Sequence, residues 1–238
     1  MAKRTLIQIL TAFLYNGNLP GFLNGRIWQG PSKSICVPGL NCYSCPGALG
    51  ACPLGALQSS LSGVLLRFPF YVLGLMLLFG LLFGRTVCGW LCPFGFIQEL
   101  LYKIPSPKFT KNKATRTLTK LKYIIGLLFV IILPVIFFYV VGVGAPAFCK
   151  YICPAGTLEA ALPLLSTNPF LKQNLGMLFN WKLFLLLVTV IASIVIYRPF
   201  CRFICPLGAF YSLFNKLSYF GIQVDNVKSV SYTHLTLP

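Results

Sequence analysis

Acidic residues and histidine are almost absent from this chain of 238 residues. It contains three acids, Glu99, Glu159 and Asp225, and a single histidine, His234. A Ser/His/Asp hydrolase needs a positioned histidine, and a membrane diheme protein needs histidine axial ligands, so both classes are disfavoured. A phosphate-binding glycine loop is also missing, because Gly142-Val-Gly144 lacks the strand and helix that such a loop requires.

Charge is scarce as well, and what exists is of one sign. Charged residues make up 10% of the chain, hydrophobic residues make up 57%, and the net charge is +17. This composition is too apolar for a soluble domain and predicts an all-α integral membrane protein. The cations flank apolar runs, so we expect them to face lipid headgroups of a bilayer, and we expect no nucleic-acid partner.

Long apolar runs define the predicted organisation. Three of them reach the roughly 20 residues that a membrane span needs, at about 62–83, 123–141 and 178–197. A short N-terminal apolar helix, about 5–15, is either a broken span or an interfacial helix. We expect residues 1–229 to form one membrane-embedded domain with a cysteine-rich loop at 36–57.

Cysteine is abundant, with ten residues in a regular pattern. Each long run is followed by the frame Cys-x-x-x-Cys-Pro-x-Gly, which we expect to form a re-entrant loop followed by a short amphipathic helix. The three frames are Cys88-Gly-Trp-Leu-Cys92-Pro-Phe-Gly95, Cys149-Lys-Tyr-Ile-Cys153-Pro-Ala-Gly156 and Cys201-Arg-Phe-Ile-Cys205-Pro-Leu-Gly208. The N-terminal loop resembles a degenerate copy, since Cys-Pro-Leu-Gly-Ala occurs at both 52–56 and 205–209.

Successive spans reverse direction, and this predicts which cysteines meet. Group one consists of Cys88, Cys92, Cys201 and Cys205. Group two consists of Cys149 and Cys153 with two of the N-terminal cysteines. Cys45 and Cys52 are favoured because proline follows each, with Cys42 as the alternative; Cys36 is either a ligand or a plain buried thiol. Arg85 and Arg198 each precede the first cysteine of a group-one frame by three residues, so we expect them to offset the charge of a bound cofactor.

The distribution of lysine and arginine predicts orientation. Twelve of these cations lie beside or after the frames that begin at Cys88 and Cys201, and five lie on the predicted opposite side. The positive-inside rule therefore places that side in the cytoplasm, in a multi-pass protein of the cell (inner) membrane.

Four thiolates suit either zinc or a [4Fe–4S] cluster. A Cys-x3-Cys-Pro ending is typical of bacterial ferredoxins, whereas zinc sites more often use Cys-x2-Cys pairs, so we predict two [4Fe–4S] clusters. A structural zinc protein remains an alternative. Another alternative is a membrane thiol–disulfide oxidoreductase that uses Cys42-Tyr-Ser-Cys45.

Two segments carry a family resemblance. Arg85-Thr-Val-Cys88-Gly-Trp-Leu-Cys92-Pro-Phe-Gly95 and Cys201-Arg-Phe-Ile-Cys205-Pro-Leu-Gly-Ala-Phe-Tyr211 resemble the paired motifs of polyferredoxin-like membrane 4Fe–4S proteins typified by NapH, NosR and CcoG. The resemblance covers about 62–220 and implies electron transfer between a quinol or soluble carrier and a partner reductase. It implies an electron-transfer subunit and not a stand-alone enzyme.

Residues outside these motifs yield further expectations. Residues 230–238 resemble translated adapter sequence, and 222–228 resemble the lead-in to a bacterial ferredoxin, so we expect a non-native tail in place of a lost ferredoxin domain. His234 lies in that tail and is expected to have no role. Glu99 and Glu159 either handle protons in quinol chemistry or are solvated residues on interfacial helices.

Overall fold

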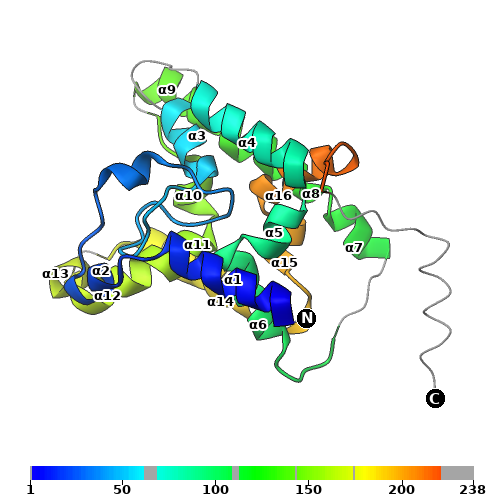
Figure 1. Ribbon diagram of the computed structural model, residues 1–238. Helices are drawn as coiled ribbons and strands as arrows, with labels where there is room; N and C mark the ends of the chain where they lie inside the picture. Colours follow the sequence, from blue (N-terminus) through cyan, green and yellow to red (C-terminus); the bar gives the residue numbers. More distant parts are fainter. Residues whose placement is uncertain (1, 62–68, 109–112, 143, 174, 221–238) are drawn as a thin grey trace.

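The protein is a bundle of mostly short helices (Figure 1). The computed structural model describes residues 2–61, 69–108, 113–142, 144–173 and 175–220. No strand occurs in these ranges, and extended backbone pairs only at a parallel bridge between Cys36 and Ala51. The helices are α1 (Ala2–Tyr15), α2 (Leu19–Asn24), η1 (Pro31–Ser34), α3 (Pro53–Leu61), α4 (Phe70–Phe83), α5 (Thr86–Trp90), α6 (Pro93–Tyr102), α7 (Lys113–Leu118), α8 (Leu121–Ile125), η2 (Gly126–Ile132), α9 (Leu133–Val141), α10 (Ala147–Tyr151), α11 (Pro154–Gly156), η3 (Thr157–Ala161), α12 (Leu162–Thr167), α13 (Pro169–Gln173), α14 (Met177–Val195), α15 (Pro199–Phe203), α16 (Pro206–Leu213) and η4 (Phe214–Lys216).

A three-helix unit occurs three times. A longer apolar helix is followed by a five-residue helix that carries the first cysteine, and then by a helix that starts at the proline after the second cysteine. The units are α4–α5–α6, the continuous helix α8–η2–α9 followed by α10 and α11, and α14–α15–α16. Each cysteine frame is thus built from two short helices, and its re-entrant placement in a membrane remains a prediction.

Two helices in the described ranges are long and apolar enough to cross a membrane, where the sequence predicted three. They are Leu121–Val141 and Met177–Val195. The first predicted span, about 62–83, contributes only the 14-residue helix α4, which begins after Pro69. Proline suits this position at the start of a helix, because it has no N–H to donate. Residues 62–68 of that span lie outside the described residues, and α1, with 14 residues, is also too short to span.

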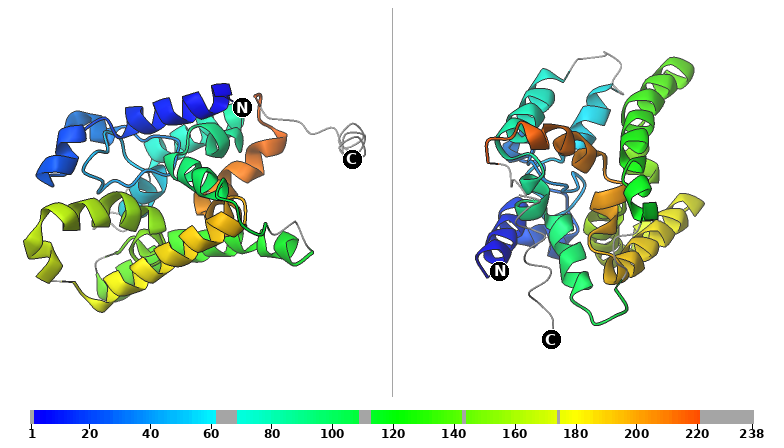
Figure 2. Two further views of the ribbon diagram at one scale, coloured as in Figure 1. Left: turned by 90° about the horizontal axis from the view of Figure 1, so that it is seen from below. Right: turned by 90° about the vertical axis from the view of Figure 1, so that its right-hand side faces the viewer.

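The helix Leu121–Val141 contains a π-helical segment, η2, directly before Pro134. Proline at this position removes one i→i−4 hydrogen bond and clashes with the preceding turn, and a wider turn accommodates both effects. Figure 2 shows this helix in green along one edge of the molecule. One face packs against α3, α10 and α16, while Ile131, Tyr139 and Val140 are exposed on the other.

The cysteine frames meet in one buried core. It includes Cys52, Cys92, Cys153 and Cys205 together with aromatic residues such as Phe94 and Tyr211. Helix α1 lies beside α5 and α6 and covers one side of this core (Figure 1). The expected non-native tail, 230–238, and the ferredoxin-like lead-in, 222–228, lie outside the described residues.

Candidate metal centres

The second cysteine of each frame lies at the start of a helix. Cys92 precedes α6, and the N–H of Gly95 donates to Cys92 Sγ at 3.4 Å. The N–H groups of the equivalent glycines lower the pKa of Cys52, Cys153 and Cys205, against the larger effect of burial. Proline suits the first helical position, because its fixed φ fits the helix and no N–H is needed there. Backbone N–H groups at helix starts favour negative charge, so the motif is built for thiolates.

The glycine of the frame allows the two short helices to approach closely. A Cβ atom on Gly95 would lie 3.0 Å from the carbonyl oxygen of Cys88, and one on Gly208 would lie 3.0 Å from that of Cys201. Any larger side chain would push the helix of the second cysteine away from the helix of the first. The glycine therefore allows the two sulfur atoms of a frame to approach the same metal centre.

The structure brings the four cysteines of group one together. Burial and the neighbouring Cys92 thiolate raise the pKa of Cys88 to about 12. Burial and Cys88 raise the pKa of Cys201 to about 11, and burial with Cys201 raises that of Cys92 to about 12. The pKa of Cys205 is raised by burial, Cys201 and Cys88. Four sulfur atoms from two distant frames thus share one buried region.

Arginine side chains surround group one. Arg198 has the left-handed φ of 49°, and its Nη1 donates to the carbonyl oxygen of Cys88 at 2.8 Å. Its Nη2 donates to Glu99 at 2.5 Å, and Arg4 of α1 pairs with the same carboxylate. The charges of Arg85 and Arg198 both lower the pKa of Cys88, against the larger effect of burial. Both predicted arginines therefore lie where they can offset negative charge on group one.

Group two surrounds a cavity of about 780 Å³. Cys42, Cys52, Cys149 and Cys153 line it. A Cβ atom on Gly156 would lie 3.6 Å from Cys42 Sγ, and one on Gly55 would lie 3.9 Å from Cys149 Sγ, so the loop and the frame at 149 are in direct contact. Burial raises the pKa of Cys42, Cys52 and Cys153 to about 12, and neighbouring thiolates add to each shift.

Cys45 and Cys36 are the other two cysteines of the N-terminal loop. Cys45 is buried, does not line the cavity, and its thiol donates to Asn16 Oδ1 at 3.6 Å. Cys36 is buried and lines the same cavity, and its backbone forms the bridge to Ala51. The geometry therefore favours Cys42 over Cys45 as the partner of Cys52, the reverse of the order suggested by the prolines.

Unpaired polar atoms at the group-two cavity indicate that an anionic group fits there. Lys33 Nζ and both polar atoms of the Asn41 side chain are buried and have no hydrogen-bond partner in the described part of the chain. Both residues line the cavity, as does Lys182, whose Nζ donates to the carbonyl oxygen of Cys149 at 3.3 Å. Buried polar groups without partners are costly, and a bound cluster with negative charge would accept hydrogen bonds from the two donors, Lys33 Nζ and Asn41 Nδ2.

Sequence reasoning missed two buried glutamines and the position of one acid. Gln58 and Gln98 each contact the first cysteine of another frame, Cys149 and Cys201 respectively. Each follows the second cysteine of its own frame by six positions, and this equal spacing was the available signal. Glu159, a half-buried residue, accepts the backbone N–H of Cys42 at 2.7 Å, and burial raises the pKa of Glu159 to about 7.

The two groups are close neighbours. Phe148 precedes Cys149, Phe200 precedes Cys201, and the two rings have centroids 6.4 Å apart. Tyr211 lies near both groups, because Cys88, Cys52 and Cys92 all raise its pKa after burial has done so. The ring contact therefore places the two cysteine groups close to each other, and their positions relative to the membrane faces remain a prediction.

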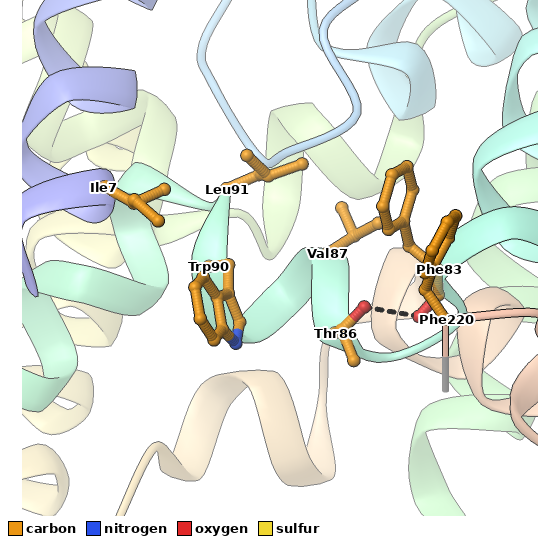
Figure 3. Close-up of a pocket in the computed structure, with 7 residues that line it drawn as sticks. All are labelled: Ile7, Phe83, Thr86, Val87, Trp90, Leu91 and Phe220. Carbon is orange, nitrogen blue, oxygen red and sulfur yellow. Dashed lines mark hydrogen bonds between the residues drawn. The ribbon is translucent and has the colours of Figure 1, made fainter. Parts of the chain in front are cut away.

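An apolar cavity of about 300 Å³ adjoins group one (Figure 3). Val87 and Trp90 line it from α5, the helix that carries Cys88, and Ile7 lines it from α1. Phe83 and Phe220 close the other side, where the Thr86 hydroxyl donates to the carbonyl oxygen of Phe83 at 2.5 Å. The cavity can hold an apolar ring beside the first cysteine of group one.

Among the described residues, no three His, Cys, Asp or Glu side chains converge closely enough to hold a single metal ion. Burial raises the pKa of Cys42 to about 12 and that of Cys45 to about 11, whereas a catalytic Cys-x-x-Cys pair has a lowered pKa.

Comparisons with known proteins agree with this geometry. The model of a family described as "4Fe-4S binding domain" matches residues 66–112, 124–166 and 180–222, and each segment contains one cysteine frame. Protein NirI of Paracoccus denitrificans is 34% identical over 147 residues, which are 59% of this chain and 19% of NirI. Regulatory protein NosR of Pseudomonas aeruginosa is 32% identical over 138 residues, which are 54% of this chain and 16% of NosR.

An uncharacterized protein of Methanocaldococcus jannaschii is 32% identical over 153 residues, which are 61% of this chain and 55% of that protein. The chain spans about half the length of the two Methanocaldococcus jannaschii relatives that it matches. No solved structure matches the chain. The family model covers more than half of the chain, including every residue of group one, and supports an iron–sulfur electron-transfer role. The chain belongs to the 4Fe-4S binding domain family.

Proposed function

We propose that this chain is a membrane-bound electron-transfer protein that holds two [4Fe–4S] clusters. The observation that carries the proposal is the assembly of two four-cysteine groups, each with two buried and two partly buried cysteines, joined by the contact between Phe148 and Phe200. Cys88, Cys92, Cys201 and Cys205 would hold one cluster, and Cys42, Cys52, Cys149 and Cys153 would hold the other. When bound, each cluster supplies a site that gains and loses one electron.

The protein contributes burial and charge to both sites. The core excludes water, which matters because solvent exposure and hydrogen bonds to sulfur set the reduction potential of a cluster. Arg85 and Arg198 offset charge at group one, and Lys33 with Lys182 does so at group two. The family's fold and these paired cations support a relay in which electrons pass between the two groups through the intervening aromatic side chains.

The carrier and the partner follow from the surroundings of group one. The apolar cavity beside Cys88 supports a quinol as one carrier, and a soluble carrier is the alternative. A partner reductase would accept electrons from the chain or donate electrons to it. The chain would then act as a subunit of a larger redox system. The exposed apolar faces of Leu121–Val141 and Met177–Val195 support a multi-pass position in the cell membrane. The positive-inside rule supports a cytoplasmic location for the Cys88 and Cys201 side.

Iron and acid-labile sulfide content tests the proposal. The protein would be purified anaerobically in detergent, and both elements measured per chain. Two [4Fe–4S] clusters require about eight of each. About four of each would mean that one group does not bind a cluster. Bound zinc, or ten free thiols with no iron, would refute the electron-transfer proposal in favour of a zinc scaffold or thiol chemistry.

A further inference from the structure

Two glutamines occupy equivalent buried positions in the two halves of the site. Gln58 follows Cys52 by six residues on α3, and Gln98 follows Cys92 by six residues on α6. Their exposed fractions are 0% and 1%. Glutamine is rarely this buried without a specific partner, because an unsatisfied carboxamide in a core costs free energy.

Each glutamine bridges to a different frame in the same way. Gln98 Oε1 accepts the N–H of Phe200 at 3.2 Å, and its Nε2 donates to Cys201 Sγ at 3.1 Å. Gln58 Oε1 accepts the N–H of Phe148 at 3.0 Å, and its Nε2 donates to Cys149 Sγ at 3.7 Å. In both cases the carboxamide forms one hydrogen bond with the backbone N–H of the residue before the first cysteine and one with the sulfur atom of the first cysteine.

The direction of these hydrogen bonds follows from the backbone. A peptide N–H can only donate, so the oxygen of each carboxamide must face Phe148 or Phe200. The NH₂ group then faces the sulfur atom, and it also donates to the carbonyl oxygen of the residue four positions earlier, at 3.4 Å in both cases. A carboxamide NH₂ has two N–H donors and no acceptor, so one N–H serves that carbonyl and the other needs a sulfur that accepts. A metal-bound thiolate is such an acceptor, whereas a thiol is a weak one.

We propose that Gln58 and Gln98 are positioning residues that raise the reduction potential of the two clusters, one glutamine per cluster. The inference rests on the proposed function. Hydrogen bonds to cysteine sulfur stabilise the more negative, reduced state of a cluster more than its oxidised state. Removing the NH₂ donor at one site should therefore shift the potential of that cluster to a more negative value.

Substitution by methionine removes the donor and keeps most of the shape. The variants Gln58→Met and Gln98→Met would be compared with Gln173→Met, whose parent side chain is exposed on α13. Midpoint potentials would be measured by redox titration followed by electron paramagnetic resonance, with iron content determined on the same samples. We expect a negative shift of one centre in each buried variant, an unchanged second centre, retained iron, and no shift in Gln173→Met.

A second measurement uses the unaltered protein. Side-chain ¹⁵N labelling of glutamine should produce a nitrogen coupling to the reduced clusters in pulsed electron paramagnetic resonance. This measurement decides the question if a methionine variant loses iron through misfolding: a coupling supports the proposal, and no coupling refutes it.

The possible failures are distinguishable. Full iron with unchanged potentials in Gln58→Met and Gln98→Met would refute the glutamine role and leave the proposed function intact. Equal shifts of both centres in every variant, including Gln173→Met, would show a general effect and also refute it. Wild-type protein without iron would overturn the proposed function, and the glutamine role with it.

Discussion

At the scale of single residues, cysteine burial is the dominant physical effect. Burial raises the pKa of Cys52 and Cys92 to about 12, although backbone N–H groups donate to both sulfur atoms. Without a bound metal these groups are thiols at neutral pH. The positive charge of a metal is what makes buried cysteines deprotonate, so cluster assembly must release protons from this core.

Cys42 and Cys45 offer a matched pair of substitutions in one loop. Cys42 lines the group-two cavity, whereas the Cys45 thiol donates to Asn16. We expect Cys42→Ser to lower iron by about four atoms per chain, the content of one cluster. Cys45→Ser should leave iron unchanged and cost only the weak thiol hydrogen bond. Iron and sulfide analysis of both variants checks this, and loss of iron in Cys45→Ser alone would contradict the assignment.

Substitution of one group-one cysteine should remove one cluster and leave the other in place. Cys88→Ser or Cys201→Ser should remove one cluster, because both sulfur atoms belong to the same four-cysteine set. The second cluster should persist, since its cysteines come from other frames. Iron content together with the number of resonance signals measures this. Equal loss of both centres in a variant that remains folded would contradict the two groups.

At the scale of helices, ion pairs connect separate elements around group one. Glu99 on α6 pairs with Arg4 on α1 and with Arg198, which precedes α15. The carboxylate therefore links three elements around group one. Arg198 is 8% exposed, so Glu99 offsets the cost of burying its positive charge.

Glu99→Gln should destabilise the fold by about 1–3 kcal/mol at neutral pH, because a mostly buried guanidinium would lose its counter-ion. Burial alone would raise the pKa of Glu99, but hydrogen bonds from Arg198 and Gln8 outweigh it and lower the pKa. A carboxyl group with a lowered folded pKa stabilises the fold above its unfolded pKa of about 4.3, and loses that contribution as pH falls through the folded pKa. Thermal unfolding in detergent from pH 7 to 3 should therefore show the variant and wild type converging at low pH.

The control for this measurement is Lys172→Gln, which neutralises an exposed charge on α13. It should change stability little at any pH, as exposed charges usually do. A constant difference between Glu99→Gln and wild type across the whole pH range would argue for packing instead of charge.

At the scale of the whole molecule, two long apolar helices each contact elements of both cysteine groups. The helix Leu121–Val141 starts beside α16 of group one and continues past α10 of group two. Helix α14 contacts α11 near group two and ends at α15 near group one. Opposite directions in these helices place the loops before and after them at different ends of the molecule.

Epitope tags test the resulting topology. A tag inserted after Lys108 should be cytoplasmic, because that segment is rich in lysine and arginine, and a tag after Lys172 should lie on the opposite side. Protease accessibility in intact and permeabilised cells measures both. Retained iron content is the control for correct folding. Tags on the same side would rule out a crossing by the helix Leu121–Val141.

Local pattern was sufficient for several features of this protein. The repeated Cys-x3-Cys-Pro-x-Gly spacing indicated sites for clusters, because proline, glycine and cysteine act on the backbone within a single turn. Apolar length indicated the spans at 123–141 and 178–197, which the structure places at Leu121–Val141 and Met177–Val195. At 62–83 the described residues form an apolar helix only over Phe70–Phe83, which is too short to span a membrane. These features depend on neighbours in the chain, and a sequence displays them directly.

Contacts between distant residues were decided only by the tertiary structure. The choice of Cys42 over Cys45, the glutamine contacts and the proximity of the two groups are of this kind. Gln98 and Cys201 are separated by 103 positions, and Cys42 and Glu159 by 117. No periodicity relates such residues, because their distance depends on how several helices pack at once. The sequence by itself determined which residues can hold clusters, and packing determined which of them face the same centre.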